Sequence, residues 1–241
     1  MLVSTGYKGQ MMCGRFYLQE SPEDIGIAFD AVVRSSWKPR YNIAPTQRVP
    51  VIRRMLELSG TPRREAIGMH WGLVPSWAKD VSIGARMINA RSETASEKPS
   101  FRKAWVDRRC LVPASGFFEW KKEAERKQPY LIRRSDGRPM GLAGLWECWR
   151  GPDGTELESV AVLTTAPNHF MKGIHDRMPV ILEPDDWTTW LDDGRDGATP
   201  DRVDRLACPA GNGILESMPV SRHVNNPAHD DPRCLEESTV K

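Results

Sequence analysis

The chain has 241 residues, 39% of them hydrophobic and 27% charged, which is the composition of an ordinary globular protein. No run of about 18 apolar residues is present, which excludes a membrane-spanning helix, and the N-terminus lacks the apolar stretch of a secretory signal. The formal net charge of +2 permits nucleic-acid binding without demanding it. The five cysteines are scattered and form no Cys-x-x-Cys pair, so neither a zinc site nor a disulfide framework is indicated and a reducing cytoplasm is favoured.

The segment Ser21–Asp24 predicts the start of the first helix. Its serine can cap the helix, its proline suits the first turn, and its two acidic residues complement the helix dipole. Ile25, Phe29 and Val32 follow at helical spacing and are expected to share one buried face.

Short apolar segments separated by turn residues dominate the rest of the chain and predict strands. Asp136-Gly137 and Gly151–Gly154 are hairpin turn sequences that lie between such segments. The predicted strands are Val49–Met55, Glu65–Val74, Cys110–Trp120, Tyr130–Arg134, Met140–Trp149, Ser159–Thr165 and Met178–Leu182. The predicted short helices are Asn168–Ile174, Asp185–Leu191 and Pro200–Leu206.

No internal repeat or long linker divides the chain, so one domain is expected over residues 13–225. We predict an α+β fold of mainly antiparallel strands, with a barrel-like sheet core and a few short helices. Residues 1–12 show no hydrophobic period and predict a leader that is disordered or removed. Residues 226–241 predict a polar C-terminal tail.

Met12-Cys13-Gly14-Arg15-Phe16 is the first segment with distinctive chemistry. If Met12 is removed, Cys13 carries a free α-amine beside its thiol, and the reference pKa values of about 8 and about 8.5 make both groups nucleophiles near neutral pH. Such an aminothiol condenses with an aldehyde through a Schiff base and closes to a thiazolidine ring. The alternative is that Cys13 is a small buried hydrophobic residue at the start of a strand.

Six further motifs combine polar and aromatic residues and lie in a fixed order along the chain. They are Tyr41–Gln47, Trp71–Trp77, Ile88–Thr94, Arg109–Trp120, Ile174–Pro179 and Pro219–Asn225. Together with the cysteine motif they resemble, from Met12 to about Asn225, the SOS-response-associated peptidase (SRAP) family of abasic-site processing proteins.

The resemblance implies a catalytic group made of a cysteine, an amide, a carboxylate and a histidine. Cys13 matches the cysteine that becomes N-terminal and bonds the open-ring aldehyde of an abasic site in single-stranded DNA. Asn89 matches the amide that orients the reactants, Glu119 the acid/base carboxylate and His175 the histidine that shuttles protons. The DNA contacts that it implies are Arg15, Asn42, Pro45, Trp71, Arg91 and Arg177.

The resemblance also implies the oligomeric state, the cofactor requirement and the cellular location of the protein. It implies a monomer with no metal and no cofactor that protects lesions during the SOS response, in the cytoplasm and on the nucleoid when bound to DNA. The family's proposed self-cleaving peptidase activity would expose Cys13. Family members normally begin Met-Cys, whereas here eleven residues precede Met12.

Each assignment has a structural alternative. Glu119 could pair with a lysine at a strand end, His175 could cap a short helix, and Asn89 could satisfy a turn. Trp71 and Trp77 could belong to the core rather than stack on bases. Two other functions stay open, namely an N-terminal-nucleophile cysteine amidohydrolase and a non-enzymatic module that binds single-stranded DNA.

Overall fold

The computed structural model describes residues 13–56, 62–123, 126–192 and 200–238, so the leader predicted over residues 1–12 lies outside it. Its strands are β1 Phe16–Leu18, β2 Ala31–Val33, β3 Arg40–Ile43, β4 Arg48–Leu56, β5 Pro62–Trp71, β6 Asn89–Arg91, β7 Arg109–Ala114, β8 Gly116–Glu123, β9 Arg126–Arg134, β10 Met140–Arg150, β11 Glu156–Thr165, β12 Met178–Pro179, β13 Ile181–Leu182 and β14 Leu215–Pro219. Its α-helices are α1 Pro22–Ala28, α2 Ser92–Ala95, α3 Arg102–Asp107, α4 Pro184–Leu191 and α5 Pro200–Leu206. Short 3-10 helices are η1 Val81–Arg86, η2 Met171–Gly173, η3 Arg222–Asn225 and η4 Pro232–Leu235.

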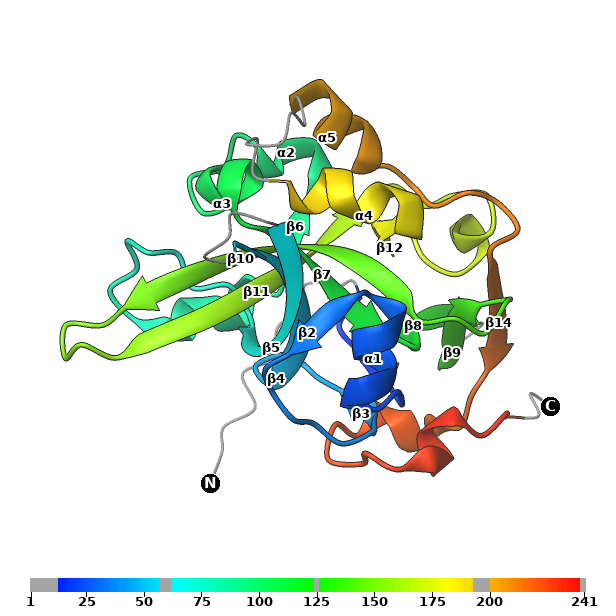
Figure 1. Ribbon diagram of the computed structural model, residues 1–241. Coiled ribbons are helices and arrows are strands. Elements are labelled where there is room, and N and C mark those ends of the chain that lie inside the picture. Colours follow the sequence, from blue (N-terminus) through cyan, green and yellow to red (C-terminus); the bar gives the residue numbers. More distant parts are fainter. Residues whose placement is uncertain (1–12, 57–61, 124–125, 193–199, 239–241) are drawn as a thin grey trace.

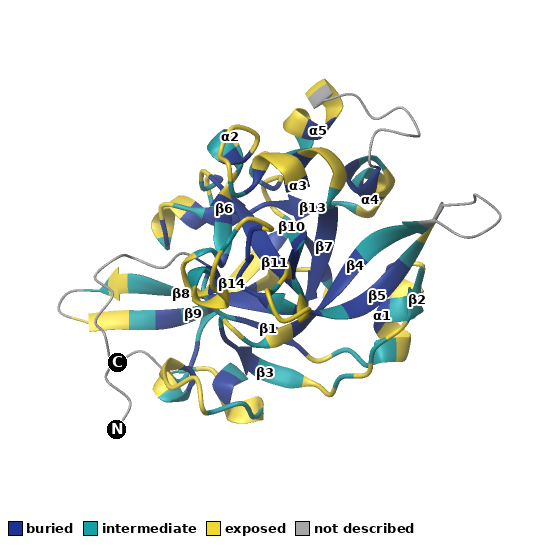
Figure 2. Ribbon diagram, turned by 90° about the vertical axis from the view of Figure 1, so that its left-hand side faces the viewer, coloured by how far each residue is buried: buried dark blue, intermediate teal, exposed yellow. Residues whose placement is uncertain are grey.

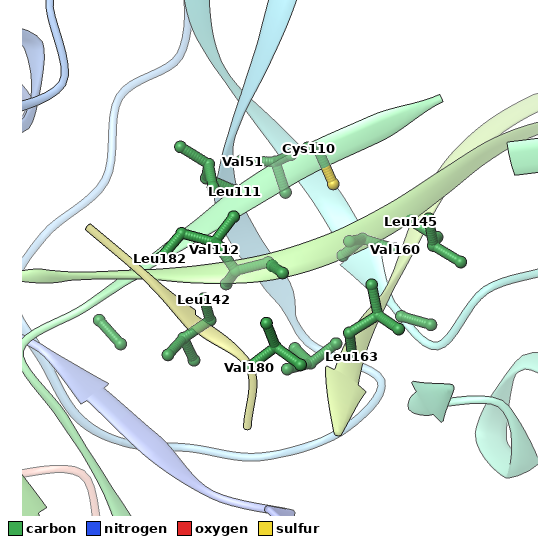
Figure 3. Close-up of a cluster of buried hydrophobic side chains, with 14 of the residues drawn as sticks. Val51, Cys110, Leu111, Val112, Leu142, Leu145, Val160, Leu163, Val180 and Leu182 are labelled. Atoms are coloured by element: carbon green, nitrogen blue, oxygen red, sulfur yellow. The ribbon is translucent and has the colours of Figure 1, made fainter. Parts of the chain in front are cut away.

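A closed barrel of the strands β11, β10, β7, β4 and β5 forms the centre of the molecule (Figure 1). Neighbours within this order are antiparallel, and parallel pairing of β5 with β11 closes the ring where His70 faces Ser159. Aliphatic side chains from these strands fill the core, as Figure 3 shows for Val51, Leu142 and Val160. The predicted α+β fold with a barrel-like, mainly antiparallel core is confirmed.

A second sheet, in the order β14, β9, β8, β1 and β3, packs beside the barrel. The chain passes from the barrel strand β7 to β8 of this sheet at Ser115, so the prediction of one strand over Cys110–Trp120 is wrong. The reason is local crowding, because a Cβ on Gly116 would lie 2.6 Å from the carbonyl oxygen of Ile132. Only glycine allows the chain to cross so close to its neighbour.

Local sequence signals account for the helices that flank the barrel. The Ser21 hydroxyl accepts a 3.1 Å hydrogen bond from Asp24 N–H and the Asp24 carboxylate accepts one from Ser21 N–H, which completes a capping box at α1. The helix ends at Ala28, and Asp30 has a φ of +49°, so Val32 lies in β2 rather than on the helical face predicted for it. In Figure 2 the barrel strands are mostly buried, whereas the outer faces of the helices are exposed.

Two predicted elements in the second half of the chain are shortened or divided in the structure. The helix expected over Asn168–Ile174 is reduced to η2, and the strand expected over Met178–Leu182 is divided into β12 and β13. The polar residues after η3 pack against β3, where the Asp230 carboxylate accepts a 2.9 Å hydrogen bond from Asn42 N–H. These residues therefore cover one end of the second sheet.

Candidate active site

Cys13 lies just before β1, with 1% of its surface exposed. Its main-chain N–H donates a 2.7 Å hydrogen bond to Oε1 of Glu119. Its φ is +42°, a left-handed conformation that is unfavourable for a residue with a Cβ. Burial and the Glu119 carboxyl raise the pKa of the Cys13 thiol well above its ordinary value.

The strand register explains why Cys13 and Glu119 meet. β1 pairs antiparallel with β8, and Phe16 faces Phe117 in this pair. Because the two strands run in opposite directions, the residues just before Phe16 lie beside those just after Phe117. The register therefore brings Cys13 alongside Glu119.

Glu119 is a buried carboxyl, 2% exposed, in the middle of β8. Burial raises its pKa to about 8, because the charged form is poorly solvated. The negative charge of Asp176 also raises this pKa, whereas the Cys13 and Trp120 N–H groups and the charge of Lys127 lower it. Glu119 can therefore take up and release a proton near neutral pH.

His175 follows η2 and is buried beside Glu119, with 3.9 Å between its Nε2 and Glu119 Oε2. Its Nδ1 accepts a 3.1 Å hydrogen bond from Arg177 N–H and lies 3.0 Å from Oδ1 of the exposed Asp176. The structure thus brings three of the four predicted catalytic residues, Cys13, Glu119 and His175, into one buried group.

The fourth, Asn89, opens β6 and is half-buried. β6 runs parallel to β11, where Asn89 faces Val162 and Arg91 faces Thr164. Arg91 is exposed at the end of this strand. β6 therefore places an amide and a cation beside the barrel strand β11. This edge of β11 is next to the loop that carries His175.

Arg177 connects this loop to α2 and β11. Its guanidinium forms a bidentate ion pair with Glu93, at 2.5 and 2.8 Å, and donates a 2.7 Å hydrogen bond to the carbonyl oxygen of Thr164. The Arg177 interaction lowers the pKa of Glu93. Sequence reasoning gave Glu93 no role, although its position two residues after Arg91 was a usable signal. Glu93 fixes the orientation of a predicted DNA contact.

Arg15 and Asn42 are both occupied by the C-terminal segment in this structure. Asn42 is fully buried, accepts a 2.8 Å hydrogen bond from Arg15 and donates to the carbonyl oxygens of Val224, at 3.1 Å, and His229, at 2.8 Å. Arg15 donates a 2.8 Å hydrogen bond to the Val224 carbonyl and lies over the Trp120 ring. In this conformation Asn42 anchors the C-terminal segment and offers no surface to DNA.

Trp71 is a core residue in the structure, as the structural alternative had it. Its side chain is 0% exposed, its indole N–H donates a 2.9 Å hydrogen bond to the Ile88 carbonyl, and its ring lies 5.1 Å from that of Phe16. A ring with no exposed face cannot stack on a base. Trp77, by contrast, is 58% exposed, and Pro45 is half-buried in the turn after β3.

A cavity of about 520 Å³ opens beside His175. Its lining combines three lysines with aromatic and apolar side chains, namely Trp120, Lys122, Lys127, Pro167, Lys172, Ile174, His175 and Asp176. A second cavity of about 500 Å³ lies between α1, β2 and α4, and none of the predicted site residues lines it. Sequence reasoning missed the three lysines, because the strand register that groups them was unknown.

The described ranges contain no group of three or more His, Cys, Asp or Glu residues placed to hold a metal ion. In the same ranges, no helix is long and apolar enough to cross a membrane.

Cys13 and Glu119, at β1 and β8 of the second sheet, and His175, in the loop after η2, thus form one buried group of a thiol, a carboxyl and an imidazole in a closed-barrel domain. The family model for the SOS response associated peptidase (SRAP) matches residues 12–227, and the chain belongs to this family. The resemblance found in the motifs is confirmed.

Curated relatives match over most of the chain. The abasic site processing protein YoqW of Bacillus subtilis is 39% identical over 93% of this chain and 99% of its own length. YedK of Escherichia coli is 32% identical over 89% of this chain and 95% of its own, and HMCES of Xenopus tropicalis is 31% identical over 93% and 78%. Both are also named abasic site processing proteins.

Crystal structures share the fold. A protein from Bacteroides thetaiotaomicron superposes with a TM-score of 0.82 at 24% identity and covers 94% of this chain and 100% of its own. A protein from Bordetella bronchiseptica superposes with a TM-score of 0.74 at 26% identity, over 87% of this chain and 100% of its own.

Proposed function

We propose that this protein forms a covalent crosslink with abasic sites in single-stranded DNA through Cys13 and so shields the lesion during the DNA damage response. The observation that carries the proposal is the 2.7 Å hydrogen bond from the Cys13 nitrogen to Glu119, inside a family whose relatives are named abasic site processing proteins. Once Cys13 is N-terminal, this nitrogen is a free amine beside a carboxyl that can take its proton.

The chemistry joins both nucleophiles of Cys13 to the aldehyde carbon. The amine adds to the open-ring aldehyde and gives a carbinolamine, which loses water to form an imine. The thiol then adds to the imine carbon and closes a thiazolidine, and the net change is the release of one water molecule. Glu119 takes a proton from the α-ammonium group and returns one to the departing hydroxyl.

His175 completes the proton path. The high pKa of the Cys13 thiol keeps it protonated, so ring closure must move the thiol proton away as sulfur bonds to carbon. The imidazole 3.9 Å from Glu119 receives this proton and returns one when the ring opens. In the same proposal Asn89 orients the sugar or the thiol.

The crosslink requires removal of residues 1–12, and the same site has the groups for this cleavage. The Cys13 thiol attacks the Met12 carbonyl carbon, the carbon–nitrogen bond breaks, and the Cys13 nitrogen takes a proton from Glu119. Water then hydrolyses the resulting thioester and regenerates the thiol. The left-handed φ of Cys13 and the Glu119 hydrogen bond at its nitrogen support this self-processing step.

Single-stranded DNA is the proposed partner because the thiol is buried and the lesion must leave the base stack to reach it. Arg91 and Arg177 hold the flanking phosphates, since the planar guanidinium suits phosphate oxygens. We further propose that the protein acts as a monomer on exposed single strands of the nucleoid.

The test is a denaturing gel of mature protein incubated with an abasic single-stranded oligonucleotide. The proposal expects a shifted band that Cys13→Ala abolishes and Cys13→Ser weakens. An equally shifted band from Cys13→Ala would overturn it. Release of ammonia from glutamine would instead support the amidohydrolase. DNA binding that salt reverses completely, and that does not depend on Cys13, would support the non-enzymatic module.

A further inference from the structure

Three exposed lysines line the cavity beside His175. Lys122 on β8 and Lys127 on β9 lie directly opposite each other in the strand register, and Lys172 of η2 reaches the same cavity. All three are exposed, and none forms an ion pair with a carboxylate of the described residues. We call Lys122, Lys127 and Lys172 the lysine pocket.

Like charges placed directly opposite each other in an antiparallel pair repel and destabilise it. Lys122 and Lys127 hold this arrangement with a third ammonium group in the same cavity. A bound anion would turn this repulsion into attraction. Because each ammonium is a compact donor with no acceptor, the pocket is suited to the oxygen atoms of a phosphate.

The rest of the lining is suited to a nucleotide rather than to a free phosphate ion. Trp120, Pro167 and Ile174 supply apolar surface next to the ammonium groups, and the wall also includes His175 of the reacting group and the exposed carboxylate of Asp176. The three ammonium groups outnumber this single carboxylate. Aromatic and apolar side chains beside cations are the usual combination in grooves that hold single-stranded nucleic acid.

We propose that the lysine pocket binds a backbone phosphate of the single-stranded DNA next to the nucleotide that reacts at Cys13. This inference rests on the proposed function and adds a further phosphate contact to those of Arg91 and Arg177. His175 lines the pocket, whereas Arg177, two residues later, turns to Glu93 and Thr164. The loop that carries His175 therefore joins two cationic surfaces, one for each side of the lesion.

Occupation of the pocket would also act on the acid/base group. Lys127 lowers the pKa of Glu119, whereas Asp176 raises it, and the other polar groups beside this carboxyl are the Cys13 N–H and the His175 imidazole. A phosphate that neutralises Lys127 leaves Glu119 more readily protonated. DNA binding would thus favour the acid form of Glu119, which donates the proton to the departing hydroxyl.

The experiment compares Lys122→Ala/Lys127→Ala/Lys172→Ala with a matched control, Lys38→Ala/Lys79→Ala/Lys103→Ala, which removes the same charge from exposed lysines outside the pocket. Affinity for an abasic-free single-stranded oligonucleotide is measured over a range of salt concentrations. The pocket variant should bind about tenfold more weakly at low salt and lose about 0.7 from the salt slope for each phosphate released. The control should lose markedly less in both quantities.

Single methylphosphonate substitutions around the abasic site then locate the phosphate. One position should weaken binding by the wild type and leave the pocket variant unaffected. Equal salt slopes in the pocket and control variants, or no such position, would overturn the pocket. If the wild type forms no crosslink and the pocket variant still loses affinity selectively, the proposed function fails and the phosphate site stands.

Discussion

The main-chain nitrogen of Cys13 donates a 2.7 Å hydrogen bond to Oε1 of Glu119, although 106 residues separate the two along the chain. The carboxyl is thus placed at the nitrogen of the cysteine, which in the proposed mechanism changes from amide to amine and then from amine to imine. A base placed at sulfur would serve a thiol nucleophile instead. A carboxyl at the cysteine nitrogen supports the aminothiol mechanism that we propose.

Glu119→Gln should slow crosslinking and leave DNA affinity unchanged. The substitution keeps the shape of the side chain and removes its titratable proton, so the loss of water from the carbinolamine loses its acid. A positioned acid contributes about 10²–10⁴-fold to such a step. Single-turnover crosslinking at saturating abasic DNA, on protein already beginning at Cys13, measures the rate. A normal rate would return Glu119 to a structural role.

The buried carboxyl should also make stability depend on pH. The pKa of Glu119 is about 8 in the folded protein against an ordinary 4.5, so between these values the folded state holds a proton that the unfolded state has lost. Stability is therefore highest below the lower value and falls as pH rises, by up to about 1.4 kcal/mol per pH unit from this group. Urea unfolding of wild type and Glu119→Gln from pH 5 to 8 isolates the effect. A difference that does not change with pH would contradict it.

Arg91 and Arg177 should each contribute one phosphate contact. Replacement of either by alanine should weaken binding to single-stranded DNA and lower the salt slope by about 0.7. Glu93→Gln should be measured beside the two arginine variants, because it breaks the ion pair that orients Arg177 without removing a positive charge. Unchanged slopes in both arginine variants would reject the contacts.

Alanine substitutions of Trp71 and Trp77 should differ in how much unfolding free energy they cost, because one side chain is buried and the other is exposed. Trp71→Ala removes a fully buried ring and its hydrogen bond to Ile88, so it should cost about 3–5 kcal/mol of unfolding free energy. Trp77→Ala removes a side chain that is 58% exposed and should change stability by less than about 1 kcal/mol. Chemical denaturation of both variants makes the comparison. Equal losses would contradict the placement of Trp71.

Structural features that depend on residues close together in the chain could be predicted from the sequence alone. The capping box at Ser21 predicts α1, and the turn at Gly151–Gly154 predicts the hairpin of β10 and β11. The α5 bounds Pro200–Leu206 agree with the prediction. Each of these features is fixed by contacts within a few residues.

Features set by distant contacts could not be predicted. The bend at Ser115 depends on the closeness of Gly116 to Ile132, and the closure of the barrel depends on a parallel pairing of β5 with β11. The hydrogen bonds of Asn42 could not be predicted for the same reason, because its partners Val224 and His229 come from the far end of the chain. The family motifs include Cys13, Glu119 and His175, but the motifs alone do not show that the register of β1 and β8 brings Cys13 alongside Glu119.

The intact mass of the crosslinked species, after nuclease digestion of the DNA, tests the central claim most directly. The aminothiol mechanism predicts a protein that begins at Cys13 and carries the sugar remnant with the loss of one water molecule. Protein that retains residues 1–12 should bind abasic DNA without forming the stable ring, because an amide nitrogen has its lone pair delocalised into the carbonyl. A stable adduct of the same composition on protein still bearing Met1 would contradict the mechanism.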